Sequence, residues 1–171
     1  MGEKCEMIHS CKMSDEQRNH QMYDSTTTFF RLTYGLKQIE DANNKVDKAS
    51  LVLTDIDHFK KINDKYGLVF GDLILEYLAK IIQRQCEENG IHNAIYVRGN
   101  ADRMIVWIPE KDINDVKNLM DLAERDFQKI VHKDYLTLNF KCGIAQMEKG
   151  VDVKEIVKRA KQAFWTARDE H

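Results

Sequence analysis

Apolar residues follow two spacings along this chain, one typical of helices and one typical of strands. Helical spacing is found over 24–43, 59–66, 72–88 and 112–130, and again from residue 152 onward. Short apolar or alternating runs predict strands at 51–54, 94–98, 103–108 and 136–145. Helices and strands that alternate in this way predict one mixed central sheet flanked by helices, an α/β (α+β) fold.

Polar residues and glycines mark the ends of several predicted helices. Asp112 stands where an N-cap is expected, and Asp152 with Glu155 three residues later opens the last helix. Gly67 and Gly90 close the two helices that follow the first predicted strand. The run 51–54 is apolar without a polar face, which favours a central strand.

Residues 1–22 are polar and weakly periodic, so we expect an N-terminal arm followed by one domain over 23–171. Ser14 with Gln17 three residues on predicts a helix that begins at Ser14. The arm is a candidate contact for a partner protein. No run approaches the ~20 apolar residues of a membrane span, and no signal sequence is recognisable, so we expect a cytoplasmic protein with no membrane contact.

The charge and the cysteines exclude several classes of function. Lysine and arginine number 26 against 28 acidic residues, and the two signs are mixed throughout, so no basic face for nucleic acid is predicted. The four cysteines show no metal-binding spacing, which indicates free thiols in a reducing compartment: Cys5, Cys11, Cys86 and Cys142.

Acidic residues follow two of the predicted strands. Asp55 and Asp57 come at the end of the strand 51–54, and Asp102 lies at the mouth of the hairpin formed by the next two strands. If these strands are neighbours, Asp55 and Asp102 converge on one divalent cation, Mg²⁺ or Mn²⁺, that would hold a triphosphate and activate a hydroxyl. Spacing alone favours a structural or solvated role for these acids.

The stretch DIDHFKKINDKYGLVFGD, residues 55–72, closely resembles the GGDEF domain family, the diguanylate cyclases of bacterial cyclic di-GMP signalling. The family pattern is D-x-D-x-F-K-x-x-N-D-x-x-G-H-x-x-G-D, and only the histidine departs, as Leu68. Residues 24–29 are similar to an eroded D-x-L-T-G-L, and 139–145 to T-V-S-I-G-V-A. The last helix, from Lys158, resembles K-x-A-D-x-A-L-Y-x-A-K. The resemblance implies a palm-like nucleotidyl-cyclase fold.

The resemblance also implies a role for individual residues. Asp55, Asp102 and the Ile56 carbonyl would bind the metal, and Asp55, Asp102 and Lys60 would be the catalytic residues. Asn63 and Asp72 would hydrogen-bond a guanine edge. The implied phosphate contacts are Lys60, the backbone around Phe59, and Arg168, which stands where the family has a lysine.

The signature itself is altered, because G-G-D-E-F becomes Asn100-Ala101-Asp102-Arg103-Met104. A left-handed backbone costs a residue with a Cβ roughly 1–2 kcal/mol, so Ala101 is a poor substitute for glycine. One hypothesis is that Gly99-Asn100 forms a two-residue turn instead. That slip would move Asp102 to the other face of its strand, away from Asp55.

Arg103 replaces an acid beside the expected metal, and a guanidinium within ~4 Å would oppose the metal by several kcal/mol. Three placements are open for it. It pairs with Asp55 or Asp102, it binds a nucleotide phosphate directly, or it points to solvent.

Three functions remain from the sequence. The first is a degenerate GGDEF domain, impaired in catalysis, that binds GTP or a related nucleotide, or a partner. The second is an active diguanylate cyclase, a homodimer that joins two GTP molecules and releases pyrophosphate. The third is a scaffolding domain that binds no ligand.

Overall fold

A computed structural model of the chain describes residues 14–129 and 137–169, with side chains up to residue 166. Its five strands form one sheet in the order β1-β3-β4-β2-β5. β1 is parallel to β3 and every other pair is antiparallel, which confirms the predicted mixed sheet. The strands are β1 (Phe30–Arg31), β2 (Lys48–Ile56), β3 (Ile95–Arg98), β4 (Met104–Pro109) and β5 (Phe140–Glu148).

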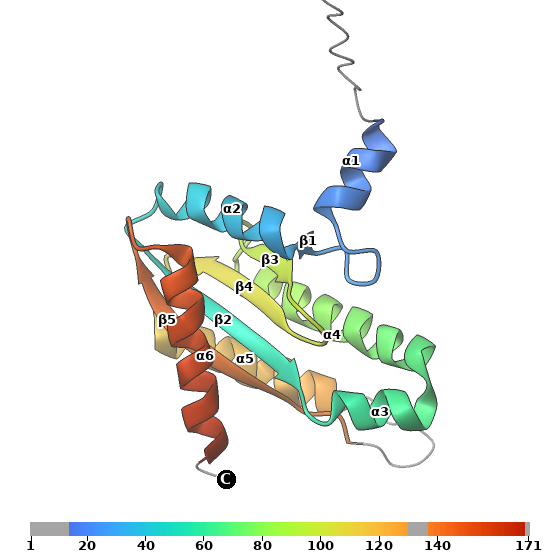
Figure 1. Cartoon of the computed structure of the whole chain (residues 1–171). Helices are drawn as coiled ribbons and strands as arrows, with labels where there is room; N and C mark the ends of the chain where they lie inside the picture. The colour runs from blue at the N-terminus through green and yellow to red at the C-terminus, as the bar shows by residue number, and fades with distance from the viewer. Residues whose placement is uncertain (1–13, 130–136, 170–171) are drawn as a thin grey trace, which may run out of the picture.

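Helices cover both faces of the sheet (Figure 1). The helices in the described ranges are α1 (Asp15–Met22), α2 (Leu32–Asn43), α3 (Phe59–Tyr66), α4 (Leu68–Glu88), α5 (Ile113–Gln128) and α6 (Val153–Asp169). α2 and α6 pack on one face, and α3, α4 and α5 pack on the other. None of the helices in the described ranges is long and apolar enough to cross a membrane.

β2 lies between β4 and β5 and is buried on both faces, as the apolar run 51–54 predicted. Leu51 and Leu53 enter the core under α2 and α6, where Trp107 also lies. Val52 and Ile56 enter the core under α3, α4 and α5. Because successive side chains of a strand point to opposite faces, one strand serves both cores.

The predicted helix starts are confirmed at three places. The Ser14 hydroxyl accepts a hydrogen bond from the Gln17 amide, and the Gln17 side-chain oxygen accepts one from the Ser14 amide, so α1 begins with a capping box. Asp112 accepts from two amides in the first turn of α5. Asp152 accepts from the Lys154 amide at the start of α6.

Three predicted boundaries are wrong. Residues 24–31 are not helical, because the Asp24 carboxylate accepts the Thr27 amide in a turn and Phe30–Arg31 then pair with β3. α4 begins at Leu68, directly after Gly67, and not at residue 72. Within the described residues the last strand begins at Phe140 and runs on to Glu148, since its pairing with β2 extends over the whole of both strands.

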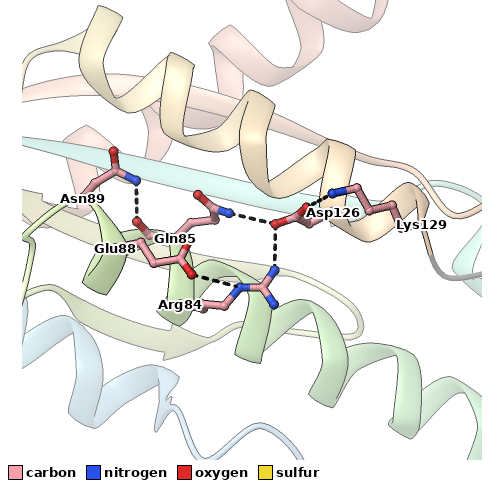
Figure 2. Close-up of polar contacts among 6 residues, drawn as sticks. All are labelled: Arg84, Gln85, Glu88, Asn89, Asp126 and Lys129. Atoms are coloured by element: carbon pink, nitrogen blue, oxygen red, sulfur yellow. Dashed lines mark hydrogen bonds and ion pairs between the residues drawn. The ribbon is translucent and has the colours of Figure 1, made fainter.

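A group of polar side chains joins α4 to α5 (Figure 2). Asp126 on α5 accepts hydrogen bonds from Arg84 at 2.7 Å and Gln85 at 2.8 Å, both on α4, and from Lys129 at 2.6 Å. Arg84 also lies 3.8 Å from Glu88. The hydrogen bond from Lys129, with those from Gln85 and Arg84, lowers the pKa of the Asp126 carboxyl.

Candidate functional site

The hairpin between β3 and β4 brings the altered signature to the end of the sheet. The Gly99 amide donates to the Arg103 carbonyl at 2.8 Å, and the Arg103 amide donates to the Asn100 carbonyl at 3.1 Å. The turn is therefore centred on Ala101 and Asp102, and Ala101 has φ +55°. The predicted Gly99-Asn100 turn is wrong, because Gly99 still pairs across the hairpin and the chain reverses beyond it.

Asp102 points back into the molecule toward β2. The residue is 9% exposed, and its carboxylate accepts a hydrogen bond from the Ile56 amide at 2.7 Å, which places it next to Asp55. Burial raises the pKa of Asp102, and the nearby charge of Asp55 raises it further. The predicted slip away from Asp55 is thus also wrong, since the Ile56 amide holds Asp102 on the Asp55 side.

Arg103 forms an ion pair with Asp55, one of the placements left open by the sequence. Its Nε lies 3.1 Å from Oδ2 of Asp55. The Arg103 side chain is 38% exposed and that of Asp55 is 28% exposed, so the pair lies at the surface end of the site. The Arg103 guanidinium is therefore paired with one of the two carboxylates, Asp55 and Asp102, that were expected to bind a metal.

Arg98 fastens the hairpin to the turn that precedes β1. Its Nη1 donates to the Arg103 carbonyl at 3.1 Å, and its Nε lies 3.9 Å from the Asp24 carboxylate. Asp24 in turn accepts both the amide and the hydroxyl of Thr27, each at 2.8 Å, and Thr28 has φ +62°. The eroded D-x-L-T-G-L motif thus keeps its turn, although threonine stands in the glycine position. Sequence reasoning missed Arg98, which nothing in the local pattern singled out.

Asn63 and Asp72 are brought to the junction of α3 and α4. A Cβ at Gly71 would overlap Oδ1 of Asn63, so the glycine lets this side chain lie directly against α4. Within the described part of the chain, that buried Oδ1 has no hydrogen-bond partner. Asp72 follows Gly71 and is exposed. An amide with an unused acceptor beside an exposed carboxylate suits a ligand edge that carries donors and acceptors.

The predicted phosphate contacts lie around the turn that leaves β2. Phe59 begins α3 and is half-buried, and Lys60 is exposed in the first turn of that helix. His58 precedes them with φ +57° and is exposed. The Arg168 side chain lies outside the described residues.

A pocket of about 160 Å³ opens beside this turn, between β2, β5 and α6. It is lined by Asp55, Ile56, Asp57, His58, Lys141 and Phe164. Lys141 lies directly opposite Asp55 in the antiparallel pairing of β2 with β5. Sequence reasoning missed Lys141, although it stands where the resembling strand motif has a serine, and this departure was the available signal.

The family model described as "Diguanylate cyclase, GGDEF domain" matches residues 21–171. The chain belongs to the GGDEF domain family. Diguanylate cyclase A of Treponema denticola is 29% identical over 169 residues, which cover 88% of this chain and 44% of that protein. Diguanylate cyclase VdcA of Vibrio cholerae is 26% identical over 130 residues, which cover 71% and 37%. This chain thus spans less than half the length of these relatives.

The fold agrees with that of solved GGDEF domains. The coiled coil and GGDEF domain of DgcB from Caulobacter crescentus, solved in complex with c-di-GMP, superposes with a TM-score of 0.80 at 19% identity. The match covers 91% of this chain and 84% of that chain. At this identity the comparison shows the shared palm-like fold.

The donor set of this GGDEF domain does not fit a divalent metal. Asp55 is paired with Arg103, and Asp102 is bonded to the Ile56 amide. No group of three or more histidine, cysteine or acidic residues within the described ranges could hold a metal ion. The positive charge of Arg103, which is paired with Asp55, would oppose each unit of metal charge ~4 Å away by about 4 kcal/mol near a protein surface. Mg²⁺ is usually bound through one or two carboxylates together with substrate phosphates, and Asp55, one of the two carboxylates here, is already paired with a cation.

Proposed function

We propose that this GGDEF domain works in cyclic di-GMP signalling by binding a guanine nucleotide without joining two GTP molecules efficiently. One observation carries the proposal: Arg103 is paired with Asp55, where the family resemblance places a metal ligand. The residues assigned to guanine are retained beside it, with Asn63 packed over Gly71 and Asp72 exposed.

The chemistry of cyclisation explains why this pair matters. Attack of a 3′-hydroxyl on an α-phosphate builds negative charge on the phosphate oxygens and on the departing pyrophosphate, and a cation held at that point stabilises it. In this domain the Asp55 carboxylate is already neutralised by a side chain. Base recognition needs only hydrogen-bonding groups, and Asn63 with Asp72 can supply both donors and acceptors.

An active cyclase is the second candidate, because the hydrogen bond from the Ile56 amide still holds Asp102 next to Asp55 despite the altered signature. Each protomer of a homodimer would then present one GTP. A scaffolding domain that binds no nucleotide is the third candidate, with the arm 1–22 as its partner contact.

The test incubates the purified protein with GTP, and separately with ATP, in Mg²⁺ and then in Mn²⁺, and resolves the products by chromatography and mass. We expect no cyclic dinucleotide. Titration calorimetry should show binding of GTP in preference to ATP, weakened roughly tenfold by Asn63→Ala through loss of the base contact. Asn118→Ala, an exposed asparagine on α5, is the matched control and should bind as the unaltered protein does.

Each other outcome selects another candidate. A cyclic dinucleotide that disappears in Asp55→Ala would establish the cyclase and show that Arg103 is tolerated. Absence of binding at millimolar GTP would leave the scaffolding domain.

A further inference from the structure

The two neighbouring carboxyls of this site need a positive charge nearby. Asp102 is buried and its carboxylate is bonded to the amide that directly follows Asp55, and two like charges held this close repel each other. A metal ion commonly removes this conflict in carboxylate sites. The carboxylates of this site do not fit a metal ion, because Asp55 is paired with Arg103, so positively charged side chains take the place of the metal.

Arg103 supplies the first positive charge. Its Nε is bonded to Asp55 at 3.1 Å, and a guanidinium carries four further N–H donors on its two Nη nitrogens. Across the described ranges, no hydrogen bond from these Nη groups is present, and the side chain is 38% exposed. Arg103 can therefore hold Asp55 and a phosphate oxygen at the same time.

Lys141 supplies the second positive charge from the opposite side of β2. It lies opposite Asp55 in the pairing with β5, and it lines the pocket of about 160 Å³ at the end of that strand. It is half-buried, and it forms no ion pair within 4 Å among the residues described. Arg103 directly precedes β4 on the other side of β2, so the two residues flank Asp55 from the two neighbouring strands.

Asp57 is the acid in this pocket that would compete for such cations. The Asp57 amide donates a hydrogen bond to the Asn139 carbonyl at 2.9 Å. Burial and the charge of Asp121 raise the pKa of Glu124 on α5, and the charge of Asp57 raises it further. The charge of Lys141 lowers the pKa of the same Glu124 carboxyl, against the effect of these acids. The pocket therefore has mixed charge: Arg103 pairs with Asp55, Arg98 carries a further positive charge near Asp102, and Lys141 lies opposite Asp55 in the pairing of β2 with β5.

We infer that Arg103 and Lys141 together replace the divalent metal of this site and bind the phosphates of a guanine nucleotide directly, so that binding needs no Mg²⁺. The inference rests on the proposed function for its ligand. Arg103 and Lys141 bring two positive charges to the two sides of Asp55, as many as a divalent ion would carry. An acid at position 103 with a serine at 141 would leave three negative charges and restore that need.

The nucleotide test measures GTP binding by titration calorimetry in EDTA and in Mg²⁺. We expect the dissociation constants in the two buffers to agree within about threefold, a difference of less than 1 kcal/mol. In EDTA, Arg103→Gln and Lys141→Ser should each weaken binding roughly tenfold, because each removes a charge-assisted hydrogen bond. Arg159→Gln is the matched control: Arg159 forms a similar pair with Glu155 on α6, at 3.2 Å, and should have no effect.

The metal test uses Mn²⁺ alone and follows the spectrum of the free ion by electron paramagnetic resonance. We expect the unaltered protein to leave the free-ion signal unchanged at millimolar Mn²⁺, and Arg103→Glu to reduce it. The reduction should vanish when Asp55→Ala is added to Arg103→Glu. Circular dichroism spectra check that each variant is folded.

These results separate the two proposals. GTP binding that is lost in EDTA would overturn the replacement of the metal and leave the proposed function standing. Tight Mn²⁺ binding by the unaltered protein would overturn it too, whether or not GTP binds. Failure to bind GTP in both buffers would overturn the proposed function, and the phosphate role of Arg103 and Lys141 with it.

Discussion

Two residues with side chains occupy left-handed backbone positions where the GGDEF pattern has glycine. Ala101 has φ +55° in the hairpin turn, and Thr28 has φ +62° in the turn before β1. Left-handed conformations crowd the Cβ, and for a β-branched residue such as threonine they are rare. Both turns are held by hydrogen bonds from their neighbours, which explains why they persist after the glycines are lost.

The strain at Ala101 predicts that Ala101→Gly stabilises the domain. The side chain is exposed, so its removal costs no packing, and the free energy of unfolding should rise by about 1 kcal/mol. Urea titration followed by circular dichroism measures the change. Ala42→Gly in α2 is the control and should lower stability by about 1 kcal/mol or more, because glycine is a poor helix former. A fall in stability with Ala101→Gly would contradict the prediction.

The elements are joined by polar as well as apolar contacts, and the pair α4–α5 shows this most clearly (Figure 2). Asp126 is 18% exposed at its side chain and accepts hydrogen bonds from two α4 side chains. Because the partners Arg84 and Lys129 are 50% and 75% exposed, water weakens these contacts. The group therefore orients the two helices more than it stabilises the fold.

For Asp126→Asn we expect a loss of about 1 to 2 kcal/mol in the free energy of unfolding at pH 7, since the charged acceptor is lost. The folded-state pKa of Asp126 is lowered, so its contribution is complete above the ordinary carboxyl pKa of about 4. As the pH falls through the lowered value, the difference between the two proteins should shrink toward zero.

Urea titrations at neutral and acid pH measure that difference. Asp121→Asn is the control on the same helix, since Asp121 is exposed, and its effect should stay within about 0.5 kcal/mol. A difference for Asp126→Asn that grows as the pH falls would contradict the assignment.

At the scale of the whole molecule, one sheet separates two cores. Leu51 lies in the core under α2 and α6, and Leu78 of α4 lies in the core on the other face. Both are fully buried. Because β2 contributes to both cores, loss of packing on one face should be felt on the other.

We therefore expect Leu51→Ala and Leu78→Ala each to lower the free energy of unfolding by about 2 to 5 kcal/mol in a single transition. Tryptophan fluorescence, which reports Trp107 in the α2 and α6 core together with Trp165 on α6, should change together with circular dichroism. Leu122→Ala, 41% exposed on α5, is the control and should have a small effect. Separate transitions for the two signals would show that the cores unfold independently.

The sequence was sufficient for several features whose deciding contacts are local, although the local turn at Asp24 was missed. Ser14 and Asp112 cap helices through amides within three residues, so the pattern that predicts them also contains their partners. The apolar run 51–54 predicted a strand with two buried faces because burial on both sides requires apolar residues at every position. The stretch 55–72 pointed to the GGDEF family for the same reason, since its fixed letters lie close together.

Tertiary structure decided the details that depend on pairing between distant segments. The position of the hairpin turn follows from the pairing of Gly99 with Arg103, and the partner of Arg103 follows from the place of β4 beside β2. Lys141 comes opposite Asp55 only through the register of β2 with β5. The sequence by itself determined the family, the order of elements from β2 onward and the residues available to the site. Only the folded sheet decided which charges meet, because a shift of one residue in register would turn each side chain to the opposite face.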